Sequence, residues 1–115
     1  MPSAMEVKPE KWREIWVLFD DGQYSVISGM YDGGSDPARR KLGERWNGTA
    51  NSPLGFPNVS GHAVWHVVPR FLEIPILHAL LDEVAKHPGH QAMGSPTDFL
   101  ERIFKELKNR QIPKL

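Results

Sequence analysis

The chain has 115 residues, 40% hydrophobic and 24% charged, and its 14 lysines and arginines balance its 14 aspartates and glutamates. This composition is typical of a globular domain and lacks the basic excess of a dedicated nucleic-acid or anionic-membrane binder. Cysteine is absent, which excludes disulfides, thiolate nucleophiles and cysteine-based metal sites. We therefore expect a single domain over residues 1–115, with no metal and no cofactor.

The N-terminal residues are polar. Residues 1–12 contain two prolines and no apolar segment of a secretory signal, so we expect them to form a mobile lead-in. No uncharged apolar run approaches the ~20 residues that a membrane-spanning helix needs. We expect a cytoplasmic protein without membrane contact.

Two runs rich in β-branched and aromatic residues follow, Ile15–Phe19 and Tyr24–Tyr31, with Asp20-Asp21-Gly22 between them. An Asp-Gly pair in this position predicts a β-hairpin with a two-residue type I′ turn, here Asp21-Gly22. The pairs that follow from this loop are Phe19 with Tyr24, Val17 with Val26, and Trp16 with Ile27.

This register distributes the hairpin side chains over two faces. One face is apolar and should join the core: Ile15, Val17, Phe19, Tyr24, Val26 and Met30. The other face carries Trp16, Leu18 and Ile27 among polar residues, and it is too apolar to lie bare in water. We expect a subunit partner or a ligand to cover it, and we assign Trp16, Leu18 and Ile27 to the contact face of a homodimer.

The middle of the chain carries weaker signals. Asp36-Pro37 predicts the start of a short helix that runs through Leu42 and stops at Gly43. Residues 47–61 are rich in turn-forming residues and should be an irregular connection. The alternating segment His62–Val68, closed by Pro69, predicts the third strand.

The C-terminal third predicts two helices. The first should begin near Glu73–Pro75 and end at His87-Pro88-Gly89. Ser95-Pro96 predicts the start of the second. Their apolar positions are Ile74, Leu77, Leu80, Leu81 and Val84 in the first helix, and Phe99, Leu100, Ile103, Phe104 and Leu107 in the second. The expected fold is α+β: a small antiparallel sheet of at least three strands with an N-terminal hairpin, and two C-terminal helices packed on one face.

The segment Arg45–Gly48 combines a planar cation, a large aromatic ring, a side-chain amide and a glycine. With further aromatic residues it could line a mostly apolar pocket that has a few polar anchors. We assign ligand binding to Arg45, Trp46, Asn47, Phe56 and Trp65. In a simpler interpretation, compatible with this one, Trp46 only holds the following loop against the sheet.

Two alternatives stay open. His62 and His66 share one face of the predicted strand but lie about 13 Å apart, too far for one metal ion. Either could be the general acid–base of a small enzyme in which Arg45 anchors an anionic substrate. The basic residues between Arg39 and Arg45 allow weak nucleic-acid binding, which the acidic Asp36 and Glu44 oppose.

The run LGERWNG (42–48), followed by GFPN and by Trp65-x-Val67-x-Pro69, resembles a group of short uncharacterised bacterial proteins, some of them carried on mobile gene cassettes. The resemblance covers most of residues 15–85. It implies a bacterial, cytosolic origin and no activity, cofactor or site residue. From the residues themselves, our hypothesis is a non-enzymatic binding or interaction module. It would be homodimeric, with a small-molecule or protein ligand at the 45–66 loop and strand.

Overall fold

The computed structural model describes residues 11–32, 39–59, 62–87 and 96–110. A four-stranded antiparallel sheet has the order β1-β2-β3-β6, and β4 and β5 form a separate small hairpin. The elements are β1 (Trp12–Asp20), β2 (Tyr24–Tyr31), β3 (Arg40–Trp46), β4 (Asn58–Val59), β5 (His62–Ala63), β6 (His66–Val67), α1 (Arg70–Lys86) and α2 (Pro96–Arg110). The α+β fold with an N-terminal hairpin and two C-terminal helices is confirmed.

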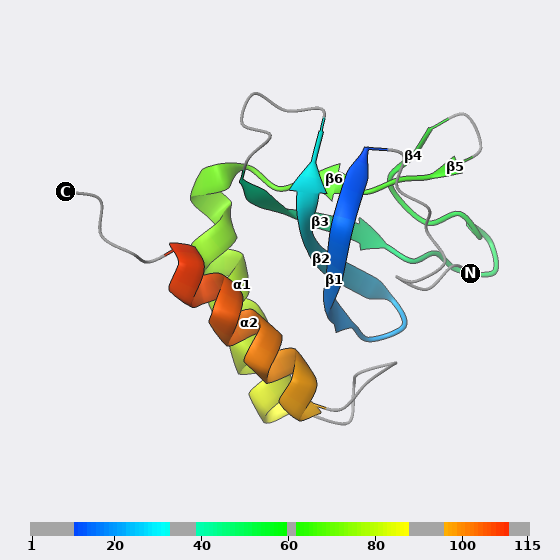
Figure 1. Cartoon of the computed structure of the whole chain (residues 1–115). Helices are drawn as coiled ribbons and strands as arrows, with labels where there is room; N and C mark the ends of the chain where they lie inside the picture. The colour runs from blue at the N-terminus through cyan, green and yellow to red at the C-terminus, as the bar shows by residue number, and fades with distance from the viewer. Residues whose placement is uncertain (1–10, 33–38, 60–61, 88–95, 111–115) are drawn as a thin grey trace.

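The two helices lie side by side on one side of the sheet (Figure 1), where α2 packs over β1 and α1 over β3. The small β4–β5 hairpin and the segment that follows β3 lie at the end of the sheet remote from the helices (Figure 1). We call the sheet surface toward the helices the helix face and the opposite surface the back face. The helix face therefore has a covered end and an open end.

The hairpin of β1 and β2 is confirmed, but its turn differs from the prediction. The loop has three residues, Asp21–Gln23, and only Gly22 has a positive φ (+92°), whereas a type I′ turn needs two. The carboxylate of Asp20 accepts the backbone N–H of Gly22 at 2.9 Å. That of Asp21 accepts the N–H groups of Gln23 and Tyr24 at 2.9 and 2.8 Å. These side-chain bonds to the backbone fix the turn.

Irregularities in β1 make the expected strand register wrong. The observed pairs are Phe19 with Val26, Val17 with Ile27, and Trp16 with Ser28, with register shifts between Arg13 and Trp16 and between Val17 and Phe19. A bulge adds one residue to one strand and so moves the side chains beyond it to the other face. Residues expected on one face are thereby divided between two.

The assignment of Trp16, Leu18 and Ile27 to a dimer face needs correction. Leu18 and Ile27 are 0% exposed and belong to the core of the chain itself. Trp16 is 41% exposed, and the cations of Arg40 and Lys105 approach its ring to 5.8 and 4.9 Å. Leu18 and Ile27 therefore cannot contact a partner in this fold.

The chain covers part of its own back face with Trp12. A Cβ atom at Gly29 or Gly43 would meet the Trp12 ring at 3.1 Å, so the indole lies directly on these two glycines. Trp12 is buried, beside Ile27 in the same core cluster. Trp12 thus belongs to the fold and not to a mobile lead-in over residues 1–12.

The third strand of the sheet is β3, where a short helix through Leu42 was expected. All seven of its residues pair with β2, from Arg40 opposite Met30 to Trp46 opposite Tyr24. The start signal Asp36-Pro37 lies outside the described residues. The expected third strand His62–Val68 is wrong as well, because it divides into β5 and β6 and only β6 joins the sheet. Pairing with seven of the eight residues of β2 outweighs a local helix signal.

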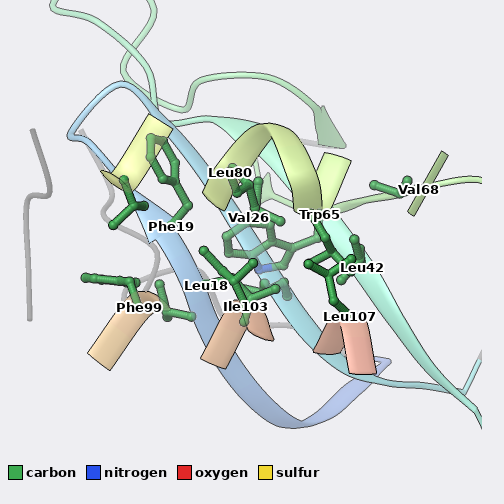
Figure 2. Close-up of a cluster of buried hydrophobic side chains, with 14 of the residues drawn as sticks. Leu18, Phe19, Val26, Leu42, Trp65, Val68, Leu80, Phe99, Ile103 and Leu107 are labelled. Atoms are coloured by element: carbon green, nitrogen blue, oxygen red, sulfur yellow. The ribbon is translucent and has the colours of Figure 1, made fainter. Parts of the chain in front are cut away.

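Apart from Trp12 and Ile27 on the back face, most of the core lies between the covered end of the helix face and the two helices (Figure 2). Helix α1 begins at Arg70, earlier than expected, and continues through Pro75. Helix α2 begins at Pro96 as predicted. The core side chains in Figure 2 include Leu18, Phe19, Val26, Leu42, Trp65, Val68, Leu80, Phe99, Ile103 and Leu107.

One position of the predicted apolar stripe in α2 is wrong. Phe104 is exposed, whereas Glu106 is buried. Glu106 is drawn inward because Ser28 donates to its Oε1 at 2.7 Å, as does Arg110 Nη1. Arg40 Nε lies 3.7 Å from Oε2.

These residues are part of a buried arginine–glutamate cluster of Arg39, Arg40, Glu73, Glu106 and Arg110. The buried Oε1 of Glu73 accepts from Arg39 at 2.7 Å and from Arg110 at 2.9 Å. The cluster joins β3 to both helices.

The outer edge of β1 also has polar contacts within the chain. Arg102 of α2 donates to the Val17 carbonyl oxygen at 3.0 Å. Arg40 Nη2 donates to the carbonyl oxygens of Glu14 in β1 and Ser28 in β2, at 2.6 and 3.0 Å, so this contact lies between the two strands. Glu14 has a positive φ (+53°) between the paired positions Arg13 and Trp16. This edge is therefore both irregular and partly capped.

Candidate functional site

Two of the predicted ligand-binding residues, Arg45 and Asn47, lie on the back face and form hydrogen bonds within the chain. The Arg45 guanidinium is buried and donates to the Val64 carbonyl oxygen at 3.1 Å and to that of Leu54. Its burial lowers the pKa of Arg45, because the charged form is poorly solvated there. Asn47 is also buried, and it donates to Asp20 and accepts from the Ser25 hydroxyl. These side chains are used within the chain.

Trp65, a third predicted ligand-binding residue, is buried in the core cluster. The structure thus does not bring Arg45, Trp46, Asn47, Phe56 and Trp65 together in one pocket wall. It separates them into an internal group and an exposed pair.

The exposed pair is Trp46 and Phe56, 56% and 69% exposed. Their backbones exchange two hydrogen bonds, of 2.7 and 3.0 Å, so their side chains project from the same face. Gly55 permits this approach: its φ is +69°, and a Cβ there would overlap the Trp46 carbonyl oxygen. The two rings are therefore exposed but held on a paired backbone.

Tyr24 extends this pair into a row of three aromatic residues. It lies opposite Trp46 in the β2–β3 register, and the two ring centroids are 5.0 Å apart with the ring planes at 56°. Tyr24, Trp46 and Phe56 thus follow one another across three neighbouring segments of the helix face.

The next row across the helix face carries the polar groups. Val26, Glu44 and His66 lie opposite one another on β2, β3 and β6. The Tyr24 hydroxyl donates to Glu44 Oε1 at 2.5 Å, and His66 Nδ1 lies 3.5 Å from Glu44 Oε2. Burial, and then the hydrogen bond and charge of Glu44, raise the pKa of Tyr24, so its hydroxyl remains a donor.

We call the surface formed by Tyr24, Glu44, Trp46, Phe56 and His66 the open sheet end. The sequence analysis placed Tyr24 in the core, and its half-buried ring does pack against the core cluster. It did not assign Tyr24 or Glu44 to the site, and it treated Glu44 only as a charge that opposes nucleic-acid binding. Had residues 40–46 been recognised as a strand, the alternation of side chains would have placed Glu44 and Trp46 on the same face.

The structure places Arg45 and His66, two residues of the enzymatic alternative, on opposite faces of the sheet. His66 lies opposite Glu44, so Arg45, the next residue of β3, projects to the other face of the sheet. His62 lies in the separate β4–β5 hairpin. A substrate anchored by Arg45 would therefore lie across the sheet from His66.

The proposed basic surface at Arg39–Arg45 is largely engaged within the chain. Arg39 and Arg40 are about a quarter exposed and lie against Glu73 and Glu106, whereas Lys41 and Arg45 are buried. The nucleic-acid alternative stays a prediction, and only Arg39 and Arg40 of these four side chains are partly accessible.

Within the part of the chain that the structure describes, no group of three or more histidine or acidic side chains could hold a metal ion. No helix among the same residues is long and apolar enough to cross a membrane. No protein-family model, curated protein or solved structure matches the chain. The resemblance to short bacterial proteins stays a prediction.

Proposed function

We propose that this protein is a binding module whose ligand contacts the open sheet end. The observation that carries the proposal is the exposure of Trp46 and Phe56 on a backbone fixed by reciprocal hydrogen bonds. Large aromatic side chains are exposed at an energetic cost in water, and they are enriched among the residues that dominate binding energy. A fixed backbone lowers the entropy lost on binding.

Polar groups beside the rings would orient the ligand. Glu44 offers carboxylate oxygens and His66 an exposed imidazole, next to the apolar surface of Trp46. A mostly apolar surface with a few directional groups is the usual make-up of a ligand site. The buried Arg45 and Asn47 on the back face would support it as a rigid scaffold.

The proposal is tested by a fragment screen on the 15N-labelled protein, read by NMR. We expect fragments to shift the Trp46 indole N–H signal and the backbone signals of residues 44–46, 56 and 66, and Trp46→Ala to abolish these shifts. Trp16→Ala is the matched control, since Trp16 is exposed near the helices. Hits that map elsewhere, or that survive Trp46→Ala, contradict the proposal.

We further propose that the protein is a homodimer that associates through the outward side of α1. This side exposes Phe71 (78%), with Leu72, Pro75 and Ala79 also exposed. An apolar outward side on a helix favours contact with another surface. Such a contact would replace the expected one through Leu18 and Ile27.

Light scattering after size-exclusion chromatography tests the dimer at high micromolar concentration. We expect a mass near twice 13.0 kDa, and a monomer for Phe71→Ser. Phe104→Ser, at an exposed phenylalanine of α2, should leave the dimer intact. A monomeric wild-type protein would exclude the dimer and leave the binding site unaffected.

A further inference from the structure

We propose that the open sheet end recognises an alkylammonium group, such as a trimethylammonium headgroup, held against the aromatic row beside the Glu44 carboxylate. This inference rests on the proposed function and adds the chemical class of the ligand. It follows from the sign of the charge at the site, from the arrangement of the rings and from the contacts of Glu44.

The charge at the open sheet end favours a cation. Its two rows, Tyr24–Trp46–Phe56 and Val26–Glu44–His66, contain one carboxylate and neither lysine nor arginine. Arg45, the cation next to both rows in sequence, points to the back face and is buried. The faces of aromatic rings carry negative potential and attract ammonium groups. An anionic ligand would meet repulsion here.

The arrangement of the rings favours a compact, rounded group. Tyr24 and Trp46 are in contact at 5.0 Å between centroids, but their planes are inclined by 56°. A flat ligand can stack on only one of two inclined rings, whereas methylated ammonium groups suit ring faces at an angle. Neighbouring strands are ~4.8 Å apart, so the three-residue row spans about 10 Å, enough for one headgroup.

Glu44 remains able to pair with a ligand cation. Its Oε1 accepts from Tyr24, but its Oε2 is 3.5 Å from His66 Nδ1, longer than an ordinary hydrogen bond. The carboxylate side chain is 31% exposed. A cation over Trp46 would therefore gain a Coulomb attraction from a group that solvent already reaches.

The test compares choline with 3,3-dimethylbutan-1-ol, its neutral isostere, by titration while the Trp46 indole N–H signal is followed. We expect choline to bind about five- to tenfold more tightly. Glu44→Gln should reduce this preference. Trp46→Ala, followed through the backbone signals of Glu44 and His66, should abolish both titrations. Trp16 serves as the internal control, because Arg40 and Lys105 already approach its ring and choline should not shift its signal.

A second arm distinguishes two sources of the same headgroup. A peptide with one trimethyllysine is compared with the same peptide carrying unmodified lysine, and with free choline. Tighter binding of the methylated peptide than of choline indicates a polypeptide source; equal affinities indicate a free amine.

Two outcomes overturn the inference. One is equal affinity for choline and its isostere. The other is that the Trp46 indole N–H signal does not shift when the protein concentration is 100-fold lower than the choline concentration. Either leaves the proposed function to be decided by the fragment screen, so the two failures are distinguishable.

Discussion

Two glutamates at the helix face, Glu106 and Glu44, illustrate how differently one fold can use the same side chain. Glu106 is buried, and Ser28 and Arg110 donate to it while Arg40 lies nearby. Glu44 is partly exposed, and its partners among the described residues are the Tyr24 hydroxyl and the more distant His66. The first carboxylate is committed to the fold, whereas the second retains capacity for a ligand.

The two glutamates differ in pairing because Glu106 lies where the helices cover the sheet, whereas Glu44 lies beyond them. Desolvation makes a buried carboxylate costly unless its oxygens are well paired, so a site beneath α1 and α2 requires the arginines that surround Glu106 and Glu73. Beyond the helices water solvates Glu44, and no such pairing is needed. The covered end should therefore respond to substitution in stability and the open end in binding.

The largest loss of stability is expected for Gly55→Ala. A Cβ would overlap the Trp46 carbonyl oxygen and lie 2.6 Å from Arg45 Nη2, at a φ of +69°. The positive φ and the overlap together should lower the free energy of unfolding by roughly 2–5 kcal/mol, measured by urea denaturation. Gly22→Ala is the control, since its φ is +92° with open space around it, and it should cost only about 1 kcal/mol. Equal effects would refute the role of the close approach.

Glu106→Gln tests the covered end. It removes one of two carboxylates from a cluster of three arginines, and it should lower the free energy of unfolding by about 2–3 kcal/mol. Glu101→Gln, on the exposed side of the same helix, should change it by less than about 0.5 kcal/mol. A neutral effect of Glu106→Gln would mean that the cluster does not stabilise the helix–sheet contact.

Tyr24→Phe removes the hydrogen bond from Tyr24 to Glu44 that joins the two rows. Its effect can be followed in the pH dependence of the free energy of unfolding. The pKa of Tyr24 is raised in the folded protein, so the folded state retains its proton where the unfolded state loses it. The resulting stabilisation is complete below pH 10 and declines as the pH rises above that value. Tyr24→Phe should cost about 1 kcal/mol at pH 7 and show a shallower decline in stability above pH 10. Identical alkaline slopes in denaturation series would contradict this assignment.

Trp46→Ala should have the smallest effect on stability, less than about 1 kcal/mol, although it removes the largest side chain of the open sheet end. The reason is that Trp46 is mostly exposed. A loss above 3 kcal/mol would favour the simpler interpretation, in which Trp46 holds the loop against the sheet. Urea denaturation beside the fragment screen separates the two roles.

The sequence predicted those parts of the fold that local signals determine. Asp21-Gly22 marked the hairpin and Pro96 the start of α2. The bulges of β1 were not predictable, because the register depends on tertiary contacts such as Trp12 lying over Gly29 and Gly43. A missed bulge was enough to assign Leu18 to the wrong environment.

The candidate site was predicted in part for a related reason. Turn chemistry and aromatic residues marked residues 45–56 as unusual, and Trp46 and Phe56 are indeed exposed. The sequence could not tell that Arg45 would be buried on the back face, because that depends on which carbonyl groups the returning chain presents. Polar residues of the kind that bind ligands also bind the protein's own loops.

The irregular, partly capped edge of β1 bears on contact between molecules through their sheet edges. An edge strand with free, regularly spaced carbonyl groups is a template for strands of other molecules and leads to fibrils. Here Arg102 occupies the carbonyl oxygen of Val17, and the bulges remove the regular spacing. Molecules in contact along this edge would lack a matching ladder of hydrogen bonds, which favours solubility at high concentration.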